Sequence, residues 1–326
     1  MRAMAQRSWN TGEPLELIEL IELPTPEPRA DEVRVSVQSI GLNPADCQML
    51  IAPPMRLLAR ALGPKPPVVL GLDFAGTVDA VGPKVRDVRP GDRVVGSTDF
   101  SRGQRGCFAE AAVVRADQVC HVPDAVDLDT AVALAIPGVT AHRTVVDIGH
   151  IRRVEPSQRR VLVLGASGAV GQLTVQIAKH EGAVVVGVCS TKNVELVKEL
   201  GADIVLDYTR GDVLEQARQY GPFQIVADCA DAYSRRKCLS LLSAQGRYVM
   251  VSMHNVADAV YTLIPPFQAR TILGRPTRDR LAPLMDAADA GQLTVNIAQH
   301  LPLTSLQEAV DLSESHRMTG KLILHP

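Results

Sequence analysis

The stretch that most constrains the fold runs from Val161 to Gly171, where four apolar residues lead into a turn rich in glycine. A continuous apolar run is typical of a parallel strand that is covered on both faces, because neither face then meets water. After the turn, Val170, Leu173 and Ile177 share one face of a helix. The pattern therefore predicts a strand, a tight turn and a helix in succession.

A turn of this kind can hold the diphosphate of a dinucleotide, because the free backbone N–H groups at a helix N-terminus attract negative charge. Gly168 would let the backbone approach the phosphates, and Gly171 would let the helix pack close to the strand. The expected binding residues of the turn are Ser167, Gly168, Ala169, Val170 and Gly171. Glycine is also common in strand–turn–helix connections that bind nothing, so the turn by itself leaves a structural role open.

The residues after the second predicted strand, 184–188, bear on the choice of cofactor. An NAD-binding site usually carries an acidic residue there, which binds the ribose 2′-hydroxyl and repels a 2′-phosphate. This chain instead has Cys189-Ser190-Thr191-Lys192. Ser190 and Lys192 can donate hydrogen bonds to a phosphate, and a bond to a charged group contributes about 1.5–3 kcal/mol. The prediction is NADP(H) rather than NAD(H); the alternative is that Lys192 is a solvated residue at the start of a helix.

Strand and helix patterns alternate through the middle of the chain, which indicates a doubly wound parallel sheet of the α/β class. The predicted strands are 161–164, 184–188, 204–206, 224–228 and 247–252, and the predicted helices are 170–181, 192–200, 211–220 and 232–242. Residues 129–136 form an alanine-rich helix, which Pro137-Gly138 either interrupts or follows with another helix. Beyond about Pro265 the sequence no longer alternates between strand and helix patterns.

The first third of the chain has a different character, with short β patterns punctuated by glycine. Apolar and polar residues alternate in Val33–Gln38, which predicts a half-buried strand. The sequence of residues 41–46 predicts a turn. Residues 53–67 are expected to form a lid or a cleft wall, and the alternative is a surface insertion. The closing run Lys321–Leu324 predicts a strand that can rejoin this β-rich part.

Length and composition exclude several classes of function. A chain of 326 residues can hold two domains, and its net charge of −2 gives no electrostatic case for nucleic acid or a membrane surface. No signal-peptide core is seen, and no apolar run approaches the roughly 18 residues of a spanning helix. The six dispersed cysteines indicate free thiols in a reducing compartment, so we expect the protein in the cytoplasm.

Several motifs occur in an order and spacing that together are highly specific. They are Gly41-Leu42-Asn43-Pro44-x-Asp46, Gly71-x-Asp73-x-Ala75-Gly76-x-Val78, Pro90-Gly91-Asp92-Arg93-Val94, Phe108-Ala109-Glu110, Gly138-Val139-Thr140-Ala141, the turn 165–171, Leu200-Gly201-Ala202-Asp203 and Thr319-Gly320-Lys321. With them the chain resembles, over nearly its whole length, the zinc-independent medium-chain dehydrogenases/reductases of the quinone oxidoreductase (zeta-crystallin) type. The resemblance implies a GroES-like β-rich catalytic domain, residues 1–124 plus 268–326, into which a Rossmann NADP-binding domain, residues 125–267, is inserted.

The resemblance also implies site residues between the two domains. Asn43, Thr140 and Gln48 are the catalytic candidates, and Asn43, Thr140 and Lys321 would also face the cofactor. Each has a plainer alternative: Asn43 as a turn residue, Thr140 as a helix cap, Gln48 as a lining side chain. The cofactor site would further include the carboxyl ends of the later strands, at Tyr208, Cys229, Ala230, Val251, Ser252 and Met253.

No metal is predicted. Zinc alcohol dehydrogenases resemble this chain, but they carry a cysteine near Asn43 and Gly-His-Glu where it has Gly71-Leu72-Asp73. Leucine cannot ligate a metal, and catalytic zinc needs three protein ligands. The eight histidines show no ligand spacing in the sequence and are interpreted as surface or hydrogen-bonded residues.

The expected function is an NADPH-dependent reductase that transfers hydride to a quinone or another α,β-unsaturated carbonyl. Many relatives carry tyrosines just after the Asn-Pro turn, whereas this chain has Cys47-Gln48-Met49-Leu50, so the loop offers no phenol as an acid. A stand-alone enoyl reductase acting on a thioester is the alternative enzyme, and an NADPH-binding protein with little catalysis is the alternative class. The expected partner is a small-molecule substrate, with a homodimer as a candidate assembly.

Overall fold

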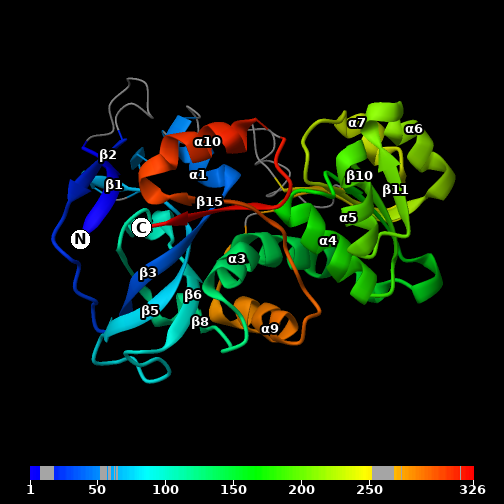
Figure 1. Cartoon of the computed structure of the whole chain (residues 1–326). Coiled ribbons are helices and arrows are strands. Elements are labelled where there is room, and N and C mark those ends of the chain that lie inside the picture. The colour runs from blue at the N-terminus through cyan, green and yellow to red at the C-terminus, as the bar shows by residue number, and fades with distance from the viewer. Residues whose placement is uncertain are drawn as a thin grey trace. The chain divides into compact units, whose positions relative to one another are not determined.

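The computed structural model describes residues 1–7, 18–51, 57, 60–61, 63, 65–251, 268–272, 274–315 and 317–326. They form two compact units (Figure 1). The first, here called the β-rich unit, consists of Met1–Ile136 and Arg275–Pro326, and the second, the inserted unit, consists of Pro137–Gly274.

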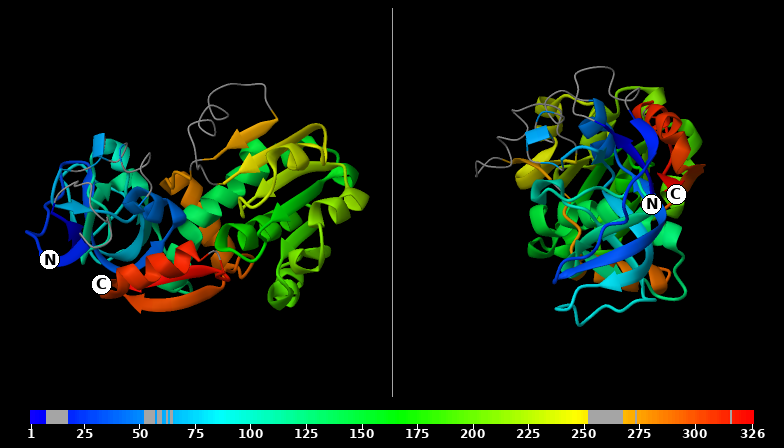
Figure 2. Two further views of the ribbon diagram at one scale, coloured as in Figure 1. Left: turned by 90° about the horizontal axis from the view of Figure 1, so that it is seen from above. Right: turned by 90° about the vertical axis from the view of Figure 1, so that its left-hand side faces the viewer.

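The inserted unit is built on a parallel sheet of six strands, which the left view of Figure 2 shows side by side. In spatial order they are β11 (Ile204–Asp207), β10 (Val184–Cys189), β9 (Arg160–Leu164), β12 (Phe223–Asp228), β13 (Leu242–Met250) and β14 (Ala269–Thr271). Numbered along the chain this order is 3-2-1-4-5-6, that of dinucleotide-binding folds. The predicted α/β class is therefore confirmed.

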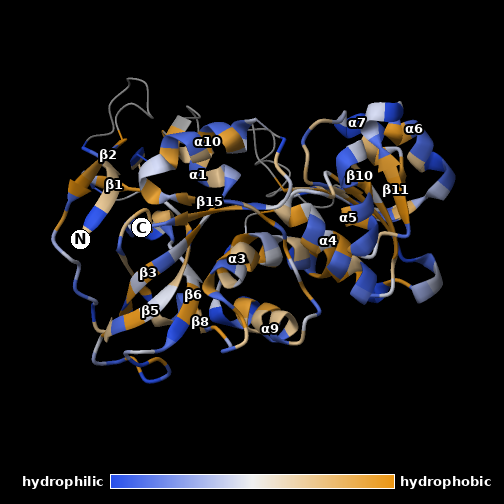
Figure 3. Ribbon diagram, in the orientation of Figure 1, coloured by the Kyte–Doolittle hydropathy of each residue, from blue (hydrophilic) through white to orange (hydrophobic). Residues whose placement is uncertain are grey.

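In the described part of the chain, four α-helices connect the strands from β9 to β13, and they are α4 (Ala169–His180), α5 (Val194–Glu199), α6 (Val213–Ala217) and α7 (Arg235–Leu239). Residues Val161–Leu164 of β9 are fully buried, as their continuous apolar run predicts for a central strand. Figure 3 shows the same hydrophobic colour on β10 and β11. Phe223 and Tyr248 add large aromatic side chains to the core.

The β-rich unit holds two sheets. A small one has the order β2 (Ile18–Glu22), β1 (Arg2–Gln6), β4 (Val68–Val69). The large one has the order β15 (Ile297–Pro302), β16 (Lys321–His325), β3 (Glu32–Leu42), β5 (Asp73–Val81), β6 (Arg93–Ser97), β8 (Val119–His121), and β7 (Ala111–Arg115) also pairs with β3. The predicted closing strand thus rejoins the β-rich part, because β16 pairs antiparallel with β3.

Among the described residues, the α-helices of this unit are α1 (Pro44–Ile51), α9 (Arg278–Asp289) and α10 (Leu306–Glu314), together with most of α3 (Leu128–His142). Its core contains Phe74 and Phe108 and includes apolar residues of α1, α10, β3 and β16. The unit therefore joins the two ends of the chain into one hydrophobic core.

The structure corrects three local expectations. The residues after Asn43 continue into α1, so Cys47–Leu50 lie in a helix and not in a loop. Helix α3 runs through Pro137 without interruption, and its buried alanines outweigh the hydrogen bond that the proline removes. Strands β14 and β15 lie where the sequence no longer alternates between strand and helix patterns. The first is only three residues long, and the second is largely exposed. Most of residues 53–67 lie outside the described part of the chain.

By length and composition, one helical stretch among the described residues, Leu128–Arg153, is long and apolar enough to cross a membrane. The sequence pattern predicts no helix of that length, because α3 is joined to a following π-helix, Arg143–Ile148, only in the structure. Of the residues tested, 67% are buried inside the protein, which is also typical of a helix that packs in a core.

Candidate functional site

The glycine turn of the inserted unit joins β9 to α4. Gly165 adopts a left-handed conformation, with φ +75°. Its carbonyl accepts a hydrogen bond from the Gly168 N–H, which closes the turn just before the helix. Gly168 is the N-cap of α4, in extended conformation. The first N–H groups of α4, from Ala169 onward, have no partner within the helix and are therefore available to an anion.

The two later glycines of the turn differ in what a side chain would meet. A Cβ atom at Gly171 would lie 2.1 Å from the Gly165 carbonyl oxygen, so glycine is required for the helix to pack on the turn. A Cβ atom at Gly168 would meet nothing nearer than that same oxygen at 3.7 Å, and its φ of −76° suits any residue. The protein itself therefore does not require glycine at 168, and the open space lies at the helix N-terminus.

The end of β12 shapes the neighbouring loop through Asp228, a buried residue that the sequence analysis missed. Its Oδ1 accepts hydrogen bonds from the N–H groups of Ala230 and Asp231, and its Oδ2 accepts one from Tyr248 at 2.5 Å. The Cβ of Ala230 would lie 3.1 Å from a Cβ atom at Gly165, so this loop borders the glycine turn. A carboxylate that ends an otherwise apolar strand is the sequence signal that could have identified it.

Cys229, in the same loop, does not have the properties of a reactive thiol. Burial, and secondly the charge of Asp228, raise the pKa of Cys229 well above its usual value. The thiol thus stays protonated and weakly nucleophilic at neutral pH. Val251 is half-buried and donates its N–H to the Asp228 carbonyl, whereas Ser252 and Met253 lie outside the described residues.

The loop after β10 holds Ser190, which is half-buried, and Lys192, which is exposed. The structure adds an acid that the sequence analysis missed, because β11 pairs with β10 and places Asp207 opposite Cys189. The Asp207 carboxylate accepts hydrogen bonds from the Thr191 hydroxyl at 2.6 Å and from the Thr209 hydroxyl and N–H, and it pairs with Arg210 at 3.2 Å. These donors hold its pKa below the usual value. Tyr208 follows directly and is 53% exposed.

The β-rich unit contains a buried polar cluster of four side chains, Asn43, Asp46, Asp73 and Lys321. The Lys321 ammonium donates to Asn43 Oδ1 at 2.5 Å, and Asn43 Nδ2 donates to Asp73 Oδ2 at 3.1 Å and to Asp46 Oδ2 at 3.3 Å. Asp46 Oδ2 also accepts from the Asn43 N–H at 2.8 Å, and Asp73 Oδ2 accepts from the Ile136 N–H at 3.1 Å. Asn43 thus connects the start of α1 with β5 and β16.

Burial changes the protonation of this cluster. It raises the pKa of Asp46 to about 7 and that of Asp73 to about 6, against an ordinary value of 3.8. Burial also lowers the pKa of Lys321, an effect that the charges of Asp73 and Asp46 oppose. The cluster is therefore one buried cation shared by two carboxyl groups, and removing Lys321 would leave both carboxyl groups without a compensating charge.

The two remaining catalytic candidates lie in helices. Gln48 is half-buried in α1, one turn after Asn43. Thr140, in the inserted unit, is 4% exposed and lies inside α3, so the alternative interpretation as a helix cap is wrong. Within the β-rich unit, the structure brings Asn43 and Lys321 into direct contact. Within the inserted unit, it places the glycine turn next to Ala230.

Two of the histidines, which the sequence predicts to be surface or hydrogen-bonded residues, meet an aspartate in space. His300, His325 and Asp129 place one ligand atom each within 4.8 Å of one another. They lie in the β-rich unit and share no residue with the buried cluster.

Two family models match the chain. That of the alcohol dehydrogenase GroES-like domain matches residues 29–124, and that of the zinc-binding dehydrogenases matches residues 200–324. Among curated proteins, the chloroplast envelope quinone oxidoreductase homolog of Arabidopsis thaliana is 28% identical over the whole chain and 98% of that protein. The trans-enoyl reductase pgmF of Aspergillus terreus is 35% identical over 61% of the chain and 54% of that protein.

A third relative, the mitochondrial NAD(P)H oxidoreductase RTN4IP1 of Danio rerio, is 31% identical over 74% of the chain, which spans 61% of that protein. The fold is that of the quinone oxidoreductase of Coxiella burnetii, with a TM-score of 0.87, 24% identity and coverage of 100% and 99% of the two chains. The Escherichia coli quinone oxidoreductase, solved in complex with NADPH, shares the fold at a TM-score of 0.79 and 24% identity, with full coverage of both chains.

Proposed function

Because the chain belongs to the medium-chain dehydrogenase/reductase family and is quinone oxidoreductase-like, we propose that it reduces a quinone or another α,β-unsaturated carbonyl with NADPH. The observation that carries this proposal is the space in front of Gly168. A site at a helix N-terminus that a side chain could fill without strain, yet which glycine keeps open, fits the diphosphate of a dinucleotide. The bound nicotinamide would supply the hydride.

The chain's own residues would hold and orient the reactants. Backbone N–H groups of residues 169–171 bind phosphate in this proposal, and the loop of Cys229 and Ala230, which Asp228 fixes, borders the dinucleotide. Asn43 has its amide engaged by Lys321, Asp46 and Asp73, so we assign it a positioning role at the start of α1. Gln48 and Thr140 are the proposed orienting groups for nicotinamide and substrate.

The proposed preference for NADPH depends on Ser190 and Lys192. Asp207 is the nearby acid that could favour NADH instead, but its carboxylate is already engaged by Thr191, Thr209 and Arg210. A carboxylate with these donors competes less for a ribose hydroxyl. Lys192 then contributes a charge that a 2′-phosphate can use.

Replacing Lys192 by alanine is expected to weaken NADPH binding about tenfold and to leave NADH binding nearly unchanged, since the lost bond is to the 2′-phosphate. Fluorescence titration with both cofactors measures the two dissociation constants. Lys198, exposed and paired with Glu195 at 2.8 Å, gives the matched control Lys198→Ala, for which neither constant should change. Equal losses for NADPH and NADH would refute the assignment of Lys192.

We further propose that catalysis needs no zinc, although one matching family model describes zinc-binding dehydrogenases. The residues do not fit a catalytic zinc. Leu72 offers no ligand atom, and the Asn43 amide oxygen accepts from the Lys321 ammonium, which already supplies a cation to the two buried carboxyl groups. A catalytic zinc would need three ligands and an open position.

NADPH oxidation that depends on an added quinone or enone should therefore survive exhaustive chelation with little change in kcat. The measurement is the steady-state rate of the purified chain before and after chelation, with a panel of acceptors. Loss of the rate on chelation and its return with zinc would contradict zinc independence. Tight NADPH binding without turnover of any acceptor would instead identify a nucleotide-binding protein.

A second enzymatic function, reduction of enoyl thioesters, is favoured by the similarity to the trans-enoyl reductase pgmF. It rests on the same site and cofactor and differs in the acceptor.

We propose a cytoplasmic protein in either case, since all six cysteines are free thiols.

A further inference from the structure

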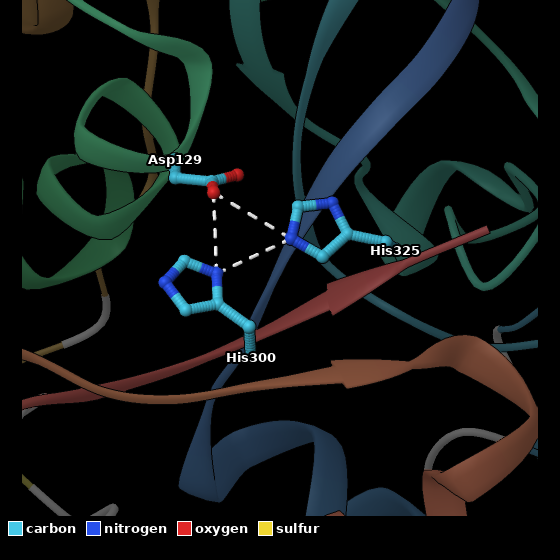
Figure 4. Close-up of side chains that lie close together, drawn as sticks. All are labelled: Asp129, His300 and His325. Carbon is cyan, nitrogen blue, oxygen red and sulfur yellow. Dashed lines mark hydrogen bonds and ion pairs between the residues drawn. The ribbon is translucent and has the colours of Figure 1, made fainter.

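Asp129, His300 and His325 form a compact triangle on the β-rich unit (Figure 4). Asp129 lies in the first turn of α3, and the histidines project from the neighbouring parallel strands β15 and β16. His300 Nδ1 is 3.2 Å from Asp129 Oδ2, His325 Nε2 is 3.5 Å from the same oxygen, and the two nitrogens are 3.3 Å apart. Three potential ligand atoms thus lie within 3.5 Å of one another. We propose that this triangle is a binding site for a divalent transition-metal ion of the Zn²⁺ type.

The dimensions of the triangle fit tetrahedral coordination. Zinc binds histidine nitrogen and carboxylate oxygen at about 2.0–2.1 Å, so two ligand atoms of a zinc tetrahedron are about 3.3–3.4 Å apart. The three observed separations, 3.2, 3.3 and 3.5 Å, lie around that value. An octahedral ion at the same bond length would need separations of about 2.9 Å, and Mg²⁺ and Ca²⁺ prefer oxygen ligands. Two imidazoles and one carboxylate therefore favour Zn²⁺.

Neighbouring groups orient two of the three ligands. The Gln38 backbone carbonyl, which can only accept, lies 3.0 Å from His325 Nδ1, so that nitrogen carries a hydrogen, and in the neutral ring Nε2 presents its lone pair to the triangle. The Ser39 hydroxyl donates to Asp129 Oδ1 at 2.5 Å and leaves Oδ2 facing inward. Ligating histidines and carboxylates usually have such hydrogen-bonded partners, which fix the tautomer and the orientation.

Asp129 is also not needed to cap its helix. The Asp127 carboxylate accepts from the Thr130 N–H at 2.8 Å and from the Thr130 hydroxyl at 2.7 Å, which satisfies the start of α3. With both imidazoles neutral and no cation bound, the triangle contains one position for a shared proton, His300 Nδ1, because His325 Nε2 and Asp129 Oδ2 both present lone pairs. A single proton cannot bridge all three contacts, whereas a metal ion at the centre would bind all three atoms.

The side chains of His300 and His325 are 52% and 40% exposed, so an ion can enter and leave, and a fourth position stays open to water. A bound metal would connect residue 129 with the last strand of the chain, one residue before Pro326. Since only the folded protein holds the three ligands together, metal binding would stabilise the β-rich unit by mass action. The proposed site is therefore a reversible metal link at the C-terminus, separate from hydride transfer.

The test uses the full chain without an affinity tag, stripped by chelation and titrated with Zn²⁺ and with Co²⁺. We expect one ion per chain, a tetrahedral Co²⁺ absorption band and a Tm that rises with Zn²⁺ concentration. His300→Ala should weaken binding at least about 100-fold, because even the partners of metal ligands are worth 10–100-fold. Ser39→Ala should weaken it about tenfold.

His121→Ala is the control, since His121 is exposed and lies 3.8 Å from one carboxylate, that of Asp92. It should bind like the wild type, and the rate of NADPH oxidation should be the same in all these variants. No binding of either ion to the wild-type chain, or equal binding by wild type and His300→Ala, would overturn the proposal. A Tm that depends on pH but not on Zn²⁺ would overturn it too, because the triangle would then share only protons.

Discussion

Replacing Gly168 by valine is expected to abolish NADPH binding while the protein still folds. The valine side chain would occupy the open space at the N-terminus of α4, where the diphosphate must approach the backbone. We expect the dissociation constant to rise at least about 100-fold, which corresponds to about 2.7 kcal/mol. Stability should change little, because φ −76° and ψ 163° suit a β-branched residue and no atom lies within 3.7 Å of the new Cβ.

Gly171→Ala is the informative contrast in the same turn. Its Cβ would lie 2.1 Å from the Gly165 carbonyl oxygen, so the variant should lose about 1–3 kcal/mol of stability through overpacking. Isothermal titration with NADPH and thermal unfolding of both variants separate the two effects. If Gly168→Val bound NADPH as tightly as the wild type, the phosphates would have to lie elsewhere.

Replacing Lys321 by methionine is expected to cost about 3–5 kcal/mol of stability at neutral pH, because it leaves two buried carboxyl groups without their cation. The wild-type ammonium donates to Asn43 Oδ1 and is the cation that Asp46 and Asp73 share. Lys179→Met is the matched control. Lys179 pairs with Asp203 at 2.5 Å, but its side chain is 45% exposed, so its loss should cost less than about 1 kcal/mol.

The stability of Lys321→Met should also depend on pH in a defined direction. The folded-state pKa values, about 7 for Asp46 and about 6 for Asp73, are raised above 3.8, and removing the ammonium would raise them further. A raised carboxyl pKa contributes stability that is complete below 3.8 and is lost as the pH rises through the folded-state value. The deficit relative to wild type should thus be smaller at pH 5 than at pH 8.

Denaturant unfolding at the two pH values measures this dependence. The double variant Lys321→Met, Asp73→Asn should recover part of the loss, since it removes one of the uncompensated charges. A deficit no larger than that of Lys179→Met, or one that grows toward low pH, would contradict the description of the cluster.

The sequence was most informative where structure is encoded locally. The apolar run of β9, the glycine turn and α4 were predicted within one residue at most boundaries, because each follows from a short pattern. The alternation in Val33–Gln38 likewise predicted β3. By contrast, the sequence of α1 predicts a loop, since glycine, asparagine and proline favour a turn whether or not a helix begins after them.

Contacts between distant residues could not be predicted from spacing. Lys321 meets Asn43 across 278 positions only because β16 pairs with β3, and Asp129 meets His300 and His325 for a similar reason. The motifs around Asn43, Asp73 and Lys321 were recognised, but their shared buried cluster follows from the sheet register. Asp207 lies beside the loop after β10 through the pairing of β10 with β11.

The residues that follow the Asn-Pro turn bear on the choice of acceptor, because Cys47-Gln48-Met49-Leu50 include no phenol. Reduction of an enoyl thioester needs a proton as well as hydride, and a positioned acid contributes typically 10²–10⁴-fold. Burial raises the pKa of Cys47 to about 12, so that thiol is a poor proton donor at neutral pH. A reduced quinone can instead take its proton from water, which makes quinones the better proposed substrates.

The most direct test of the proposed function compares kcat/KM for a small ortho- or para-quinone with that for a crotonyl or longer enoyl thioester, at saturating NADPH. Gly168→Val is the negative control for any rate that does not depend on the proposed cofactor site. We expect the quinone to be reduced with the higher kcat/KM and the variant to be inactive. A clear preference for the thioester, or turnover of neither substrate, would contradict the assignment as an NADPH-dependent quinone reductase.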